Sequence, residues 1–106
     1  MSARKFDLFR PKGYGNVVID RVNGFLLVKL HGNTVVAIDE TTKRFRLDDC
    51  GWVTATTTTA MNTALRQFRP DVHVRRSRGT MIVSFANGEE EAVLDPQAWY
   101  GFGEVA

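Results

Sequence analysis

Residues 25–40 read FLLVKLHGNTVVAIDE, and this stretch decides the fold that the sequence predicts. Two largely apolar runs, residues 25–31 and residues 34–40, flank the pair Gly32-Asn33. A glycine-containing pair between two such runs is typical of a β-hairpin with a two-residue turn. With two central residues in this turn, the directly opposed pairs are Leu30 with Val35 and Leu27 with Ile38.

The flanking residues extend this hairpin into a meander. Residues 17–20 form a short first strand, and a turn at Thr41-Thr42 leads into a strand over residues 43–48. Residues 25–30 are apolar on both faces, which is typical of a central strand that is covered on both sides. One core face is predicted, and it contains Phe25, Leu27, Val36, Ile38, Phe45 and Leu47.

A short amphipathic helix follows this meander. Apolar residues recur at the i, i+3, i+4 and i+7 positions of one helical face, namely Met61, Ala64, Leu65 and Phe68. A threonine hydroxyl can accept a hydrogen bond from an unpaired backbone N–H, so we place the N-cap at Thr56 or Thr57. Pro70 disfavours helical conformation in the residue before it, so the helix is predicted to end at Arg69.

Two further turn signals predict a second meander after the helix. Strands over residues 73–77 and 80–86 are joined by Arg78-Gly79, and Asn87-Gly88 leads to a strand over residues 90–95. One face of this meander aligns Val74, Val83 and Ala92. The opposite face is expected to be half-exposed and includes His73, Ser84 and Glu91.

The predicted fold class is therefore α+β, with two antiparallel β-meanders flanking one amphipathic helix in the order ββββ-α-βββ. The 106 residues fit one domain of ordinary size. Within this domain we distinguish a basic N-terminal arm over residues 1–15, a core over residues 16–95 and an aromatic C-terminal tail over residues 96–106.

The composition excludes several classes of protein. The net charge is +2, from 14 Lys and Arg against 12 Asp and Glu, which is too small to indicate a nucleic-acid binder by itself. Cys50 is the single cysteine, so an intrachain disulfide is impossible. No apolar run approaches the about 18 residues of a membrane span, and no apolar segment follows the basic N-terminus as in a signal peptide. We therefore expect a cytoplasmic protein without membrane contact.

Neither catalysis nor metal binding is predicted. The two histidines, His31 and His73, and the one cysteine lack the close spacing of metal ligands. His73 shares a sheet face with Ser84 and Glu91, but in-register neighbours on a flat face offer no pocket and no oxyanion donors. We expect a protein that is not an enzyme and that needs no cofactor and no metal.

Basic and aromatic residues supply the candidate binding site. The N-terminal arm carries Arg4, Lys5, Arg10 and Lys12. The helix end and the next strand carry Arg66, Arg69, Arg75, Arg76 and Arg78, and the tail adds Trp99 and Tyr100. If the arm folds beside these arginines, the positive, partly aromatic face would suit phosphates and single-stranded bases. The alternative is that the arginines only solvate a surface whose acids lie elsewhere.

Residues 47–62 carry the most specific motif, a Gly-Trp-x-Thr-x-Thr-Thr block that begins at Gly51 and is followed by Met61-Asn62. This stretch resembles a family of small proteins encoded by tailed bacteriophages, which share a hydrophobic meander, this block, a short helix and a closing hairpin. The resemblance spans residues 16–95. It implies a phage origin and the cytoplasm of an infected bacterial host cell, and it brings no catalytic residues.

The block itself has two interpretations. In the structural one, Gly51 allows a sharp turn, Trp52 plugs the core and the threonines of residues 54–59 cap the helix. In the functional one, the threonine hydroxyls and the helix N–H groups hold an anion or a phosphate. The sequence favours the structural interpretation.

The leading functional hypothesis is a non-catalytic phage accessory protein that binds nucleic acid, or a nucleic-acid-handling complex of the host, through its arginine-rich face. The alternative is an inhibitor of a host or defence protein that acts by protein–protein contact, with Trp99 and Tyr100 as aromatic anchors. The same aromatic residues would equally suit a homodimer interface.

Overall fold

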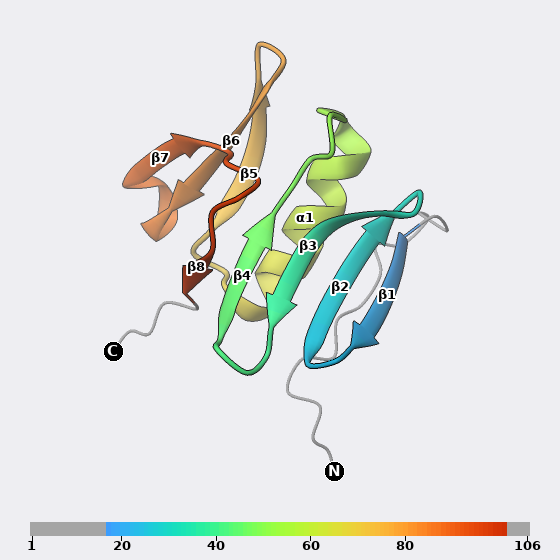
Figure 1. Cartoon of the computed structure of the whole chain (residues 1–106). Coiled ribbons are helices and arrows are strands. Elements are labelled where there is room, and N and C mark those ends of the chain that lie inside the picture. The colour runs from blue at the N-terminus through green and yellow to red at the C-terminus, as the bar shows by residue number, and fades with distance from the viewer. Residues whose placement is uncertain (1–16, 102–106) are drawn as a thin grey trace.

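The computed structural model describes residues 17–101 and confirms the α+β class, with one α-helix and two antiparallel sheets (Figure 1). The first sheet has the strand order β1-β2-β3-β4-β8, and the second has the order β5-β6-β7. The first sheet is formed by β1 (Val17–Val22), β2 (Phe25–Leu30), β3 (Asn33–Asp39), β4 (Arg44–Leu47) and β8 (Tyr100–Gly101). The other elements are α1 (Ala55–Phe68), β5 (His73–Ser77), β6 (Thr80–Phe85), the short 3-10 helix η1 (Ala86–Gly88) and β7 (Glu90–Val93).

The hairpin of β2 and β3 differs from the prediction by its turn. The turn residues are His31 and Gly32, at φ 53° and 82°, rather than Gly32 and Asn33. The shifted turn alone would place Phe25 opposite Ile38, but a β-bulge between Val28 and Lys29 moves the register back by one residue, so that Leu26, and not Leu27, lies opposite Ile38. A slip of one residue exchanges the two faces of a strand. The predicted placement of Phe25 and Leu27 in the core was therefore wrong, and β2 instead contributes Leu26, Val28 and Leu30.

β2 is an inner strand between β1 and β3, but the prediction that both of its faces are covered was wrong, because Phe25, Leu27 and Lys29 are only partly buried. A turn at Asn23 and Gly24, with φ 50° and 85°, joins β1 to β2 and extends β1 to Val22. The middle of the first sheet is β3, in which the four residues 35–38 are all buried. The predicted pairing of β3 with β4 is confirmed, because Val36 lies opposite Leu47 and Ile38 opposite Phe45.

Helix α1 is capped two or three residues earlier than the predicted N-cap at Thr56 or Thr57. Thr54 is the N-cap, and its Oγ1 accepts a hydrogen bond from the backbone N–H of Thr57 at 3.3 Å. Starting there gives the Thr57 side chain a buried partner, because the two hydroxyl oxygens lie 3.1 Å apart. The predicted end is confirmed, since Arg69 is the C-cap residue and Pro70 follows.

The apolar face of α1 closes the core between the two sheets. Met61, Ala64 and Leu65 are buried there, as the helical spacing predicts. The helix contacts β2 and β3 of the first sheet and β5 of the second, and Figure 1 shows it behind the first sheet with the second sheet beside it. The ring of Phe68 meets the buried ring of Phe45 edge-on at a centroid distance of 5.2 Å.

The second sheet has the predicted register. Val74 lies opposite Val83, and Val83 lies opposite Ala92. Ser84 was expected on a half-exposed face, yet only 1% of its surface is accessible. Its hydroxyl donates a hydrogen bond to Oε2 of Glu91 at 3.1 Å, which lets a polar side chain be buried on that face. The connection to β7 passes through η1 and is longer than a two-residue turn.

The described part of the aromatic tail, residues 96–101, folds back onto the first sheet and adds an eighth strand that the predicted order lacked. Tyr100 of β8 lies opposite Phe45 of β4 in the first sheet. Its ring centroid is 5.4 Å from that of Phe45 and 5.1 Å from that of Phe85 in β6. β8 therefore joins the two sheets. No helix between residues 17 and 101 is long and apolar enough to cross a membrane.

Candidate nucleic-acid interface

The structure separates the predicted site residues into groups with different surroundings. Arg4, Lys5, Arg10 and Lys12 lie outside the described residues. Trp99 is half-buried between the ring of Phe25, at a centroid distance of 6.4 Å, and the guanidinium of Arg46, which lies 5.2 Å from the Trp99 ring. Tyr100 is also half-buried, and this burial raises the pKa of its hydroxyl. Both aromatic side chains pack against sheet residues of their own chain.

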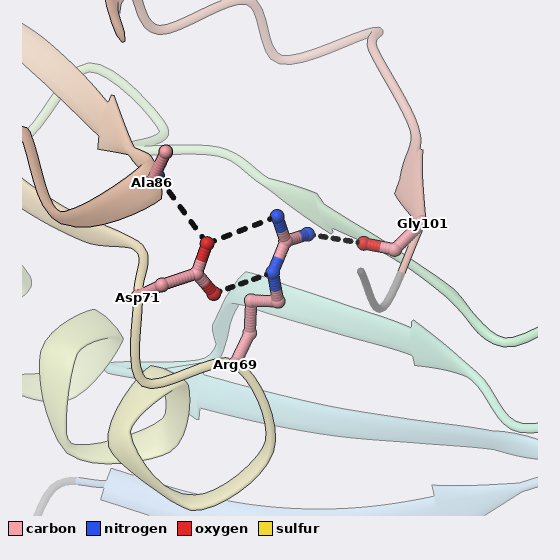
Figure 2. A network of polar contacts seen from close by, with 4 residues as sticks. All are labelled: Arg69, Asp71, Ala86 and Gly101. Atoms are coloured by element: carbon pink, nitrogen blue, oxygen red, sulfur yellow. Dashed lines mark hydrogen bonds and ion pairs between the residues drawn. The ribbon is translucent and has the colours of Figure 1, made fainter. Parts of the chain in front are cut away.

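Arg69 is held by a network that we call the Arg69 clamp, which consists of Arg69, Asp71, the Ala86 N–H and the Gly101 carbonyl (Figure 2). Arg69 contacts both carboxylate oxygens of Asp71, with Nε at 2.6 Å and Nη2 at 3.2 Å. Its Nη1 donates to the Gly101 oxygen at 2.6 Å, and the Ala86 N–H donates to Asp71 at 3.3 Å. The guanidinium holds the pKa of Asp71 below its ordinary value. Arg69 thus joins the end of α1 to β8, and its donors are occupied within the protein.

Arg75 of β5 is partly neutralised by an acid on β7, on the far side of β6. Its Nη2 lies 2.9 Å from Oε1 of Glu91, and both side chains are more than 40% exposed, at 47% and 42%. Hydrogen bonds from Arg75 and Ser84 lower the pKa of Glu91. Because the pair is open to solvent, Arg75 can exchange this carboxylate for another anion at little cost.

Arg76 and Arg78 differ from the other arginines of the cluster. Both are exposed, and neither side chain has a hydrogen bond or an ion pair with any residue between 17 and 101. They line a shallow groove of about 510 Å³ between the β5–β6 hairpin and the start of α1. The rest of the lining is Val53, Thr58, Val74, Arg75 and Gly79, and we call this feature the arginine groove.

The arginine groove owes its position to one asparagine of α1. The side chain of Asn62 accepts a hydrogen bond from the Val74 N–H at 2.8 Å and donates to the Val74 carbonyl at 3.0 Å. This pairing fixes the edge of β5 against the helix. One helical turn earlier, Thr58 lines the groove beside Arg76. Arg66, on the same helix, is exposed, and its Nη2 lies 3.5 Å from the Thr63 hydroxyl.

Trp52 does not plug the core as predicted, because 60% of its surface is exposed. The chain turns sharply at Cys50 and Gly51, with φ 54° and 83°, and the Trp52 N–H donates to the Asp49 carbonyl at 2.7 Å. Only two residues then separate Gly51 from the N-cap Thr54, and this connection is too short to return the indole to the core.

Trp52 borders a second hollow, of about 490 Å³, which we call the Trp52 hollow. It lies on the other side of the first turn of α1 and is lined by Leu30, His31, Asn33, Val35, Asp49, Cys50, Trp52, Thr54, Thr56 and Thr57. Burial raises the pKa of the Cys50 thiol, and the nearby Asp48 and Asp49 carboxylates raise it further. The thiol is therefore protonated near neutral pH and is a poor nucleophile.

Comparison with known proteins gives one assignment. The sequence model of the family described as "Kyanoviridae Gp96 protein" matches residues 4–101. The chain belongs to this family. Gp96 is a phage protein family, so the predicted resemblance to small tailed-phage proteins is confirmed, and the match includes most of the arm and of the tail. The family name states no activity for Gp96. No curated protein and no solved structure matches the chain.

The described part of the chain contains no group of three or more His, Cys, Asp or Glu side chains that could hold a metal ion together. Two hollows of this part of the chain, the arginine groove and the Trp52 hollow, flank the same turn of α1. The start of α1 and the β5–β6 turn lie at the same end of the molecule in Figure 1. These two features are the candidate interface.

Proposed function

We propose that this chain is a non-catalytic phage accessory protein that binds nucleic acid through the arginine groove, in the cytoplasm of the infected bacterial cell. The observation that carries the proposal is which of the arginine side chains have an acidic partner. The described acids occupy Arg69 and Arg75, whereas Arg76 and Arg78 line a groove without an acidic partner between residues 17 and 101. Guanidinium groups bind phosphate through paired N–H donors.

The hydroxyl-bearing start of α1 supports the same proposal. Thr58 contributes to the groove wall, and the first turn of a helix presents backbone N–H groups and a partial positive charge. The first turn contains no acidic residue that would neutralise this charge. A phosphate in the groove would therefore meet guanidinium groups near the positive end of the helix, where the Thr58 N–H itself already donates to the Thr54 carbonyl.

Salt-dependent fluorescence anisotropy with labelled DNA and RNA tests the proposal. The double variant Arg76→Ala/Arg78→Ala is expected to bind about tenfold more weakly at low salt, because it removes two phosphate contacts. The slope of log K against log salt should fall by about 1.4 for a single strand. Arg44→Ala, an exposed arginine on β4, is the matched control and should leave both quantities unchanged. Equal affinity of the double variant and the wild type would refute the groove as the site.

A second candidate function is inhibition of a host or defence protein by direct contact. The exposure of Trp52 favours it, because exposed tryptophans are common anchors of protein interfaces. Trp99 and Tyr100, the anchors that the sequence suggested, are already half-buried against their own chain. Affinity capture from host lysate, with and without nuclease, separates the two functions. A partner retained after nuclease treatment and lost with Trp52→Ala would favour the inhibitor.

A further inference from the structure

The two hollows beside the first turn of α1 have opposite chemistry. Val53 and Thr58 of this segment face the arginine groove, whereas Trp52, Thr54, Thr56 and Thr57 line the Trp52 hollow. The groove offers guanidinium groups and suits an anion. The hollow contains no Lys or Arg in its lining, and it includes the carboxylate of Asp49. A chain with alternating anionic and uncharged groups could occupy both.

The Trp52 hollow has the features of a site for a flat, uncharged group. Trp52 supplies exposed apolar surface, since 60% of this residue is accessible, and the core residues Leu30 and Val35 also line the hollow. The Asp49 carboxylate already accepts a hydrogen bond from the Gly51 N–H at 2.9 Å and disfavours a phosphate by like charge. Together with His31 and Asn33 at the rim, it offers hydrogen-bonding groups to a ligand with exocyclic N–H or carbonyl groups.

We propose that the Trp52 hollow is a base-binding subsite, in which Trp52 stacks on an unpaired nucleobase of a single strand whose phosphates lie in the arginine groove. This inference rests on the proposed function and specifies its substrate class as single-stranded nucleic acid. A base within a duplex is held in its stack and cannot reach a side chain in a hollow, whereas a single strand can turn a base outward. Stacking on an aromatic ring is largely independent of base identity, so little sequence preference is expected.

The test measures binding and Trp52 fluorescence in the same protein. Trp99→Phe leaves Trp52 as the only tryptophan and serves as the parent. An oligothymidylate of about 15 nucleotides should quench the fluorescence of this parent on binding. Trp52→Ala should weaken binding of the oligothymidylate about 10- to 100-fold, and Trp52→Phe should restore most of it because a ring remains. A duplex of the same length should bind the parent and Trp52→Ala equally.

The outcomes separate this inference from the proposed function. If Arg76→Ala/Arg78→Ala weakens binding while Trp52→Ala does not, and the fluorescence stays constant, the base subsite is refuted and the groove stands. If Trp52→Ala weakens duplex and single strand alike, the substrate class is refuted. If no oligonucleotide binds the parent at low salt, the proposed function itself fails. Unchanged circular dichroism of Trp52→Ala, expected for an exposed side chain, shows that the variant is folded.

Discussion

Replacing Arg69 tests whether the Arg69 clamp stabilises the fold. The side chains of Arg69 and Asp71 are 17% and 32% exposed, so their ion pair is more shielded than one on an open surface. Arg69→Ala removes the paired hydrogen bonds to Asp71 and the bond to the Gly101 carbonyl. The Asp71 carboxylate would keep the Ala86 N–H as its partner. The variant is therefore expected to be less stable than the wild type. The loss is limited because the Asp71 carboxylate keeps one hydrogen-bond donor.

The expected loss follows from two limits. Exposed ion pairs contribute about 0.2–1 kcal/mol, and breaking a buried pair costs about 3–5 kcal/mol. The partial exposure of the pair and the extra bond to Gly101 place Arg69→Ala between these limits, at about 2–3 kcal/mol of unfolding free energy. For a domain of this size, that corresponds to a fall in Tm of about 8–15 °C.

Urea and thermal unfolding, followed by circular dichroism, measure this loss. Arg66→Ala on the same helix is the matched control, because Arg66 is exposed and has only a 3.5 Å contact with Thr63. Its effect should stay within about 0.5 kcal/mol. Arg69→Lys keeps the charge but cannot form the paired geometry, so an intermediate stability is expected. If Arg69→Ala were no less stable than Arg66→Ala, the clamp would contribute nothing and the reasoning would be refuted.

The clamp also predicts an acid dependence. Arg69 lowers the pKa of Asp71 in the folded protein, so the unfolded state binds a proton at higher pH than the folded state does. The stability that the pair contributes is complete above the unfolded pKa and is lost as the pH falls through the folded pKa. The difference between wild type and Arg69→Ala should therefore narrow below about pH 4. A difference that stays constant down to about pH 2 would contradict an ionic contribution.

Three further substitutions test the elements that position the interface. Asn62→Leu should lower the unfolding free energy by about 2 kcal/mol in urea, because the N–H and carbonyl of Val74 lose their partners beside the helix; a neutral effect would refute this role. Thr54→Ala should cost about 1 kcal/mol by the same measurement, since the Thr57 N–H loses its cap, and Thr54→Ser should retain most of the stability. Phe45→Ala should cost about 3–5 kcal/mol in thermal unfolding, because its ring is fully buried, and a loss below 1 kcal/mol would contradict the packing described.

The fold was predictable from the sequence wherever a turn or helix-end signal was compatible with only one local structure. The pair Arg78-Gly79 follows the last residue of a clear alternating run, and Pro70 ends the helix regardless of its surroundings. The two-residue turn around Gly32 had two possible positions in the sequence, because the second turn residue can be either His31 or Asn33. β2 is apolar on both faces, so its sequence pattern is compatible with either turn. Packing against the rest of the fold decides which face of β2 lies in the core. The signal at Asn23-Gly24 was present in the sequence and was overlooked.

The candidate site was less predictable because it depends on contacts between distant residues. The five arginines of the cluster look alike in sequence, and only the folded chain gives Arg69 the Gly101 carbonyl and Arg75 the Glu91 carboxylate. Tryptophan side chains are mostly buried in proteins, so the residue type alone predicted a buried Trp52, whereas the folded chain exposes it. Side-chain pairing across the fold, rather than charge along the chain, leaves Arg76 and Arg78 available.

The pairing of β8 with β4 has a consequence for synthesis of the chain. Ribosomes make β4 early, but its outer edge stays without a partner until Tyr100 and Gly101 emerge. The nascent chain therefore carries an open strand edge, and the Phe45 ring lacks its Tyr100 neighbour throughout elongation. Premature termination before β8 would leave this edge permanently open. Truncated products should accordingly aggregate or depend on chaperones far more than the full chain does.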